Sequence, residues 1–389
     1  MRRLITHVDL VTHDEVIRDG SLLIEDGLIT ALCPVAPAYE HEMNGCGALC
    51  LPGLIDLHCD ALEKEIEPRP RVAFNHSFAL ENSDRRNVHA GITTIYHAVS
   101  FAGGEWGVRD PRIAAAVAQA VRGFCGLVDH KTHLRYEVTD GGGEEAVTTA
   151  MLAGAADLLS FMDHSPGQGQ FRDIAAYVGY MTRTYHTSEA DAIRFGESKV
   201  EARRAAPERM ARLAALARSR HIALASHDDD TAEKVGEMAR LGVTISEFPI
   251  GLDAAHAALR AGMVTLFGAP NVVRGGSASG NVKAIDAIRA GACTGLCSDY
   301  HPPALLAALL MLPRHSELTL PQAVRLATSA PARAAGLTDR GSIAVGQRAD
   351  VVLVREIADA PRVEAVMVAG RMALDTIDRH ACQTLSAGA

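Results

Sequence analysis

Short apolar runs that end in polar clusters recur along the middle of the chain, and most are followed by a stretch with apolar residues at helical spacing. Eight of these runs are predicted to be buried strands. They cover residues 53–60, 91–99, 133–139, 156–164, 221–229, 242–249, 263–271 and 295–302. The helical spacing is clearest in residues 113–124, 198–220, 230–242, 253–262 and 282–291. This alternation predicts an α/β fold of the (β/α)8 TIM-barrel type, because an open doubly wound sheet usually has fewer strands.

The two ends of the chain show a different pattern, in which apolar and polar residues alternate. LITHVDLVT (4–12) near the start and GSIAVGQRADVVLV (341–354) near the end are examples. Such alternation is typical of strands with one face buried. We therefore expect a small β-sandwich built from both termini, residues 1–50 and 335–389, beside a barrel domain of residues 51–334.

Composition excludes several classes of protein. Hydrophobic residues make up 48% of the 389 residues and charged residues 22%, which is typical of a chain with a sizeable core. The 38 basic and 47 acidic residues give a net charge of −9, which argues against nucleic acid or an anionic membrane as partner. No apolar run reaches the roughly 18–20 residues of a membrane helix, and the eight cysteines are few and irregularly spaced. We expect a cytoplasmic protein with a small-molecule substrate, and a homo-oligomer is compatible with the sequence.

Polar side chains at the ends of the predicted strands are the first candidates for chemistry, because a TIM barrel carries its active site at the carboxyl ends of its strands. The predicted metal ligands are His58, Asp60, Glu137, His164, His227 and Asp299. Imidazole and carboxylate groups suit one or two divalent ions, most often Zn²⁺, with Mn²⁺ or Fe²⁺ as alternatives. One histidine at a strand end usually has a structural role. The hypothesis of a metal site therefore depends on several of these residues lying close together. Asp299 is also the predicted general base, and Glu247 fits either a substrate contact or a partner of a metal ligand.

A segment rich in glycine and serine, GAPNVVRGGSASGNVK (268–283), follows the seventh predicted strand and is expected to open a helix. Loops at this place commonly bind phosphate, since free N–H groups at a helix start point at the anion; a simple loop or lid is the alternative. Several cations near one mouth predict an anionic substrate. The predicted phosphate-binding residues are Lys64, Arg69, Arg135, Arg274, Ser277 and Lys283, with Arg172 and Ser279 as further candidates.

Motifs along the whole chain resemble the amidohydrolase superfamily. They are LPGLIDLHCD (51–60), Asp299 at the last strand, TSAPARAAGL (328–337) and GSIAVGQRADVVLV (341–354). The first strand of this superfamily usually carries His-x-His, whereas this chain has His58-Cys59-Asp60. Cys59 is expected to point away from the mouth and to serve packing.

Further segments resemble, in the same order, a branch of the superfamily that acts in phosphonate catabolism. They are DLHCDALEKEIEPRPRV (56–72), AGITTIYHAVSF (90–101), FMDHSPGQGQF (161–171) and SDYHP (298–302). The resemblance implies a metal-dependent diphosphatase that converts α-D-ribose 1-methylphosphonate 5-triphosphate and water into the 5-phosphate and diphosphate. Two alternatives stay open: hydrolysis of a C–N bond by a deacetylase, cyclic amidase or deaminase, and a non-catalytic assembly protein.

Overall fold

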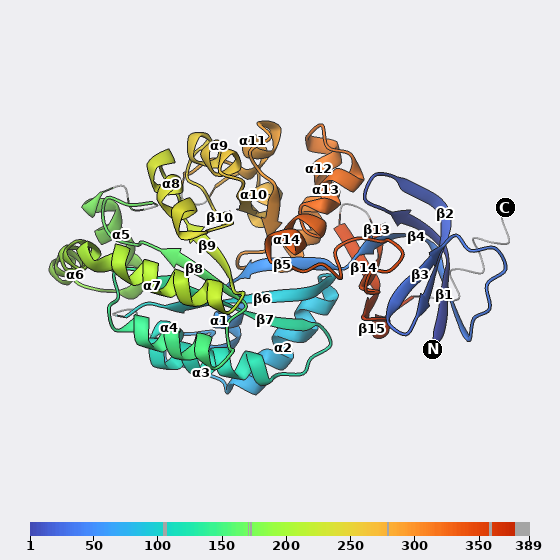
Figure 1. Cartoon of the computed structure of the whole chain (residues 1–389), viewed down its shortest axis with the longest axis horizontal. Helices are drawn as coiled ribbons and strands as arrows, with labels where there is room; N and C mark the ends of the chain where they lie inside the picture. The colour runs from blue at the N-terminus through green and yellow to red at the C-terminus, as the bar shows by residue number, and fades with distance from the viewer. Residues whose placement is uncertain (104–106, 170, 172, 278–279, 358–359, 378–389) are drawn as a thin grey trace.

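Two β-sheets organise the molecule, one from the middle of the chain and one from its two ends (Figure 1). The structure, a computed structural model, describes residues 1–103, 107–169, 171, 173–277, 280–357 and 360–377. Within these residues, no helix combines the length and the apolar character that crossing a membrane requires.

The central sheet has eight strands in the order β12-β11-β10-β9-β8-β7-β6-β5, and its neighbouring strands run parallel. Its strands are β5 (Leu54–Cys59), β6 (Ile92–Phe101), β7 (Asp129–Glu137), β8 (Leu158–Met162), β9 (Ala223–His227), β10 (Ile245–Glu247), β11 (Val264–Gly268) and β12 (Gly295–Cys297). The first and last strands meet through backbone hydrogen bonds: the Asp60 N–H donates to the Asp299 carbonyl (2.7 Å), and the Asp299 N–H donates to the His58 carbonyl (3.0 Å). The predicted TIM-type barrel is confirmed, with a strand overlapping each of the eight predicted runs; β6 and β7 extend beyond theirs.

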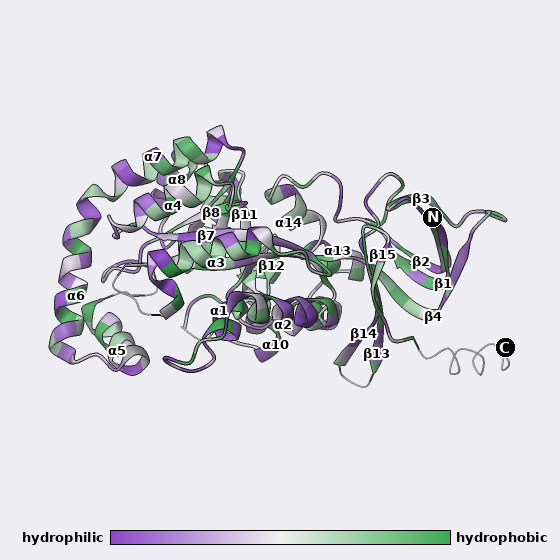
Figure 2. Ribbon diagram, turned by 90° about the horizontal axis from the view of Figure 1, so that it is seen from below, coloured by the Kyte–Doolittle hydropathy of each residue, from purple (hydrophilic) through white to green (hydrophobic). Residues whose placement is uncertain are grey.

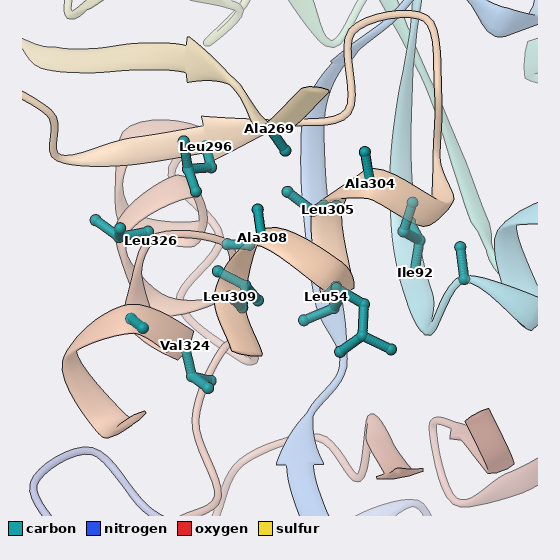
Figure 3. Packing of buried hydrophobic residues seen from close by; sticks show 14 of the residues in the cluster. Leu54, Ile92, Ala269, Leu296, Ala304, Leu305, Ala308, Leu309, Val324 and Leu326 are labelled. Atoms are coloured by element: carbon teal, nitrogen blue, oxygen red, sulfur yellow. The ribbon is translucent and has the colours of Figure 1, made fainter. Parts of the chain in front are cut away.

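Helices surround the barrel and turn one apolar face toward it, as the colouring of α3 and α7 in Figure 2 shows. On one side, Leu305 and Leu309 of α12 lie among Leu54 of β5 and Leu296 of β12 (Figure 3). The helices are α1 (Ala61–Ile66), α2 (His76–His89), α3 (Pro111–Gly123), α4 (Gly143–Leu152), α5 (Ile174–Tyr185), α6 (Glu189–Ala202), α7 (Ala206–Ser219), α8 (Ala232–Leu241), α9 (Leu252–Arg260), α10 (Ala269–Arg274), α11 (Ala284–Arg289), α12 (Pro303–His315), α13 (Leu320–Arg325) and α14 (Ser329–Ala334).

The predicted helical stretch 198–220 is divided in the structure. Helix α6 ends at Ala202, a 3-10 turn spans Arg203–Ala205, and α7 begins at Ala206 with Pro207 in its first turn. Proline has no N–H donor, so it is favoured at the start of a helix and disfavoured in its interior. Helices α5 and α6 form a hairpin between β8 and β9 that the sequence patterns did not indicate.

The two chain ends form the second sheet, with the order β15-β14-β13-β4-β1-β2-β3. Its strands are β1 (Arg2–Val11), β2 (Val16–Glu25), β3 (Leu28–Leu32), β4 (His41–Pro52), β13 (Val351–Ile357), β14 (Ala360–Val368) and β15 (Arg371–Asp375). Hydrogen bonds join all seven into one sheet, which folds over so that Leu28 pairs with Arg348. Ile5, Leu10 and Leu353 are buried in the core enclosed in this way. The predicted β unit from both termini is confirmed as this folded sheet.

Candidate active site

Buried imidazoles and a carboxylate meet at the carboxyl ends of the barrel strands. His58 is the second-to-last residue of β5, His227 ends β9 and Glu247 ends β10. The His58 Nδ1 atom lies 3.0 Å from Glu247 Oε1, and the His227 Nδ1 atom lies 3.5 Å from Glu247 Oε2. The rings of His58 and His227 stack with centroids 5.5 Å apart. The fold therefore brings together residues that lie far apart in the sequence.

Two further groups of possible ligands overlap with this one. The first contains His58, Asp60 and Asp299, and the second contains His164, His227 and Asp228. Within each group, one ligand atom of every residue lies within 4.8 Å of those of the others. Five of the six predicted metal ligands thus lie in groups with the spacing and chemistry that a divalent ion requires.

The backbone of β5 explains how the side chains of His58 and Asp60 reach the rim of the barrel. Its pairing with β6 is irregular between Asp56 and Cys59, as a bulge would make it. Leu57 packs inside the barrel, while the next side chain, His58, lies at the rim only 3.5 Å from Asp60. Cys59 is buried in the apolar layer outside the barrel, where the alternation placed it.

Arg135 lies between two of the candidate ligands. Its Nη1 atom donates to Asp60 Oδ1 (3.1 Å), and its Nη2 atom lies 3.3 Å from His227 Nε2. Burial alone would raise the pKa of the Asp60 carboxyl, but the Arg135 guanidinium and the contact with His58 hold that pKa well below its usual range. Asp60 is therefore ionised at neutral pH.

Asp299 differs from Asp60 in its electrostatic surroundings. Burial, together with the nearby negative charge of Asp60, raises the pKa of Asp299 to about 6. Its backbone is left-handed, with φ of 57°, and Asp228 (φ 53°) and Phe248 (φ 52°) share this conformation directly after β9 and β10. Such strained residues cluster at functional sites, where the surrounding structure holds them in place.

Glu137 lies outside the three ligand groups, unlike the other predicted metal ligands. Its carboxylate accepts hydrogen bonds from the Thr139 hydroxyl (2.6 Å) and the His164 backbone N–H (3.2 Å). It also lies 3.4 Å from His164 Nδ1 and 3.6 Å from Lys199 Nζ. In this geometry Glu137 orients His164.

A cavity of about 270 Å³ opens over these groups. Among the predicted phosphate-binding residues, Arg135, Arg274 and Ser277 line it, and Lys64, Arg69 and Lys283 do not. The latter three are exposed side chains: Lys64 on α1, Arg69 in the turn after it, and Lys283 before α11. Arg172 and Ser279 lie outside the described residues.

The Gly-rich segment contains a short helix that the prediction did not include. Helix α10 begins directly after β11, and Gly275, with φ of 73°, ends it. The glycines therefore follow α10, and Gly276 and Ser277 reach the cavity from the helix's carboxyl end. The segment also leads into a helix as predicted, since Lys283 is the N-cap of α11, which begins at Ala284. The additional helix α10 begins earlier because Pro270 is tolerated in its first turn.

Other residues that line the cavity do not lie at the ends of strands, so the strand pattern did not predict them. Arg109 comes from a 3-10 turn and pairs with Glu63 (3.0 Å), and Lys199 comes from α6. The remaining polar and aromatic residues that reach the cavity without having been predicted include Tyr177, Tyr180, Asn271, Asn281 and Tyr300. Arg109 and Lys199 are visible in the sequence only as ordinary surface cations.

Comparison with known proteins identifies the family of the chain. The model of the Amidohydrolase family matches residues 49–373. The chain is 39% identical over 358 residues to the α-D-ribose 1-methylphosphonate 5-triphosphate diphosphatase of Escherichia coli (strain K12), covering 90% of this chain and 94% of that protein.

Solved structures share the fold at low identity. The ochratoxinase of A. niger superposes with a TM-score of 0.66 at 15% identity, covering 96% of each chain. A triazine hydrolase variant gives 0.63 at 16% identity, covering 100% of this chain and 99% of that one. The family match and the similarity to the diphosphatase show that the chain belongs to the amidohydrolase family.

Proposed function

We propose that this protein is a metal-dependent hydrolase that releases diphosphate from α-D-ribose 1-methylphosphonate 5-triphosphate in phosphonate catabolism. The observation that carries the proposal is the 39% identity to the Escherichia coli diphosphatase over 90% of the chain. The cavity supports it, because Arg109, Arg135, Lys199 and Arg274 line one mouth of a protein with a net charge of −9.

The residues proposed to hold one or two divalent ions are His58, Asp60, His164, His227 and Asp299. We propose Zn²⁺, with Mn²⁺ or Fe²⁺ as alternatives. The site fits such an ion, because these imidazole and carboxylate groups bring their ligand atoms to within 4.8 Å of one another in each group. A bound ion would lower the pKa of a water molecule toward about 7 and would offset charge on the phosphate oxygens.

Asp299 is proposed to orient the attacking water and to take its proton. A carboxylate with a pKa of about 6 is ionised at neutral pH and is a stronger base than an ordinary aspartate. The water oxygen forms a bond to the α- or the β-phosphorus of the triphosphate, and that phosphorus loses its bond to the oxygen that bridges the two. Diphosphate leaves, and the 5-phosphate remains on the sugar. Arg135 lies where it can stabilise charge on the non-bridging oxygens.

The domain organisation is part of the proposal. We propose residues 51–334 as the catalytic domain and residues 1–50 and 335–389 as the sandwich domain. All described residues that line the cavity lie between His58 and Tyr300, within the proposed catalytic domain. A cytoplasmic location and a homo-oligomeric state are also proposed.

Product analysis tests the function directly. The purified protein is incubated with the ribosyl triphosphate in ¹⁸O-labelled water, and phosphorus products are followed by ³¹P NMR. We expect diphosphate and the 5-phosphate in equal amounts, loss of activity after removal of metal by a chelator, and recovery with Zn²⁺ or Mn²⁺. The position of ¹⁸O identifies the phosphorus that is attacked.

Two results would contradict the proposal. Release of orthophosphate alone would indicate a terminal phosphatase. Hydrolysis of N-acyl or cyclic-amide compounds without turnover of the triphosphate would favour the C–N hydrolase.

A further inference from the structure

Two walls of the cavity differ in chemistry, and this difference bears on how the substrate is oriented. One wall comes from α10 and the segment after it, which contribute the polar groups of Asn271, Arg274 and Ser277. The other comes from the α5–α6 hairpin, which contributes Tyr177 and Lys199. The preceding strands, β11 and β8, are three places apart in the barrel, so the two walls lie on different sides of the mouth.

The α5–α6 wall is mainly aromatic. Phe171, Tyr177 and Met181 form a small buried cluster, and Tyr180 packs against it. The Phe171 ring contacts Tyr177 (centroids 5.3 Å apart) and His164 (6.0 Å). The aromatic surface therefore begins directly beside the candidate ligands. Aromatic rings pack well against the C–H faces of a sugar, whereas a triphosphate binds better to polar groups.

Lys199 is the cation of this wall. Its side chain is only 15% exposed, and its ammonium lies 3.6 Å from the fully buried carboxylate of Glu137. One helical turn later, Arg203 pairs with Asp163 (2.9 Å), which ties the end of α6 to the segment after β8. The ammonium is thus held at a fixed place on the wall, and it carries three N–H donors for an anion.

A second chamber of about 200 Å³ adjoins the cavity behind this wall. Tyr177, Met181 and Lys199 line both spaces, while Phe195 and Ser198 line the chamber alone. Lys199 therefore stands at the boundary between the reacting centre and a partly apolar recess. A small group with one apolar and one anionic part, such as a methylphosphonate, matches this combination.

We propose, building on the function proposed above, that Lys199 binds the methylphosphonate on C1 of the ribose. The sugar then lies against Tyr177 and Tyr180, and the leaving diphosphate is directed toward α10. The substrate has anionic groups on both sides of its ribose, and the two walls supply a separate cation for each, Lys199 and Arg274. Lys199 is a specificity-determining residue in this arrangement, because it contacts a group that takes no part in bond cleavage.

The experiment compares two substrates that differ only at C1. One is the ribose 1-methylphosphonate 5-triphosphate, and the other is the methyl riboside 5-triphosphate, which is neutral at C1. The variants are Lys199→Met, Lys199→Gln and Lys199→Arg. The matched control, Arg194→Met, removes a positive charge from the same helix at a side chain that is 73% exposed. Thermal unfolding of each variant checks that it is folded.

We expect Lys199→Met and Lys199→Gln to lower kcat/KM for the phosphonate-bearing substrate about 10- to 100-fold, mostly through KM, since one charge-assisted contact is lost. For the neutral substrate the expected loss is below about 3-fold. Lys199→Arg should keep most of the preference, and Arg194→Met should change neither value.

Three results would overturn the inference. Equal losses on both substrates would place Lys199 against the shared triphosphate, and no loss on either would remove it from binding. If the unmodified protein turned over ATP faster than the phosphonate-bearing substrate, the aromatic wall would be a binding surface for a nucleobase. Failure of the unmodified protein to hydrolyse any of these triphosphates counts instead against the proposed function.

Discussion

The terminal sheet and the barrel rim both bury a glutamate, but they balance its charge differently. In the terminal sheet, Glu364 is 2% exposed and accepts hydrogen bonds from Arg355 (3.0 Å) and Arg362 (2.6 Å). At the rim, Glu247 is fully buried beside imidazoles, with His58 at 3.0 Å and His133 at 3.7 Å. The sheet supplies permanent cations, whereas the rim supplies groups that are neutral unless they bind a proton or a metal ion.

This difference separates buried carboxylates that have a structural role from those that have a role in the candidate active site. A carboxylate paired with two arginines has its charge balanced by residues of the protein, and the pairing contributes to stability. The carboxylates at the rim, which include Asp60, Asp228, Glu247 and Asp299, outnumber the one buried guanidinium among them, that of Arg135. A bound divalent cation would offset this excess of carboxylates at the rim.

The largest effect is expected from Asp299→Asn, which removes the proposed base and keeps the shape of the side chain. Turnover should fall about 10²- to 10⁴-fold, since general-base catalysis is lost. The free energy of unfolding should change by less than about 1 kcal/mol, because burial already disfavours the charge of Asp299. Steady-state kinetics, metal analysis and chemical denaturation measure the three properties. Full activity with normal metal content would remove Asp299 from its assigned role.

A smaller effect concerns buried histidine outside the site. His97 Nε2 lies 2.8 Å from His130 Nδ1, and His130 Nε2 lies 2.9 Å from Asp84 Oδ1. Burial, with a contribution from His130, lowers the pKa of His97 well below its ordinary value. The unfolded chain therefore binds a proton below a pH of about 6.5 that the folded protein does not bind.

Stability should consequently fall on acidification, by about 1.4 kcal/mol per pH unit for this one group below its unfolded pKa. His97→Gln should remove that part of the slope. Urea denaturation of both proteins between pH 7 and pH 5 measures it. An unchanged slope in the variant would show that His97 is protonated in the folded protein.

The smallest effect is expected from Glu364→Gln in the terminal sheet. The variant should lose about 1 kcal/mol of stability, because both arginine partners are partly exposed and water screens the pairs. Its kcat should equal that of the unmodified protein, since no residue of this sheet lines the cavity. A large loss of activity with intact folding would mean that the sheet and the rim are coupled, and the comparison drawn above would fail.

The barrel could be predicted because its strands are buried and short, and each ends in a turn. That topology also explains why His58, His227 and Asp299 could be grouped before their distances were known. Lys199 could not be found in this way, because its place depends on how the α5–α6 hairpin packs, and a lysine on a helix usually faces solvent. Glu137 shares the inward face of β7 with Arg135, but alternation alone does not tell which neighbour a side chain contacts.

The closure of the barrel has a consequence for synthesis. The hydrogen bonds that join the first and last strands are made by the backbone of His58, Asp60 and Asp299. The same three residues form one of the ligand groups. A growing polypeptide therefore cannot assemble this group until its final barrel strand has left the ribosome. An ion bound by this group would also link the first and last strands of the barrel.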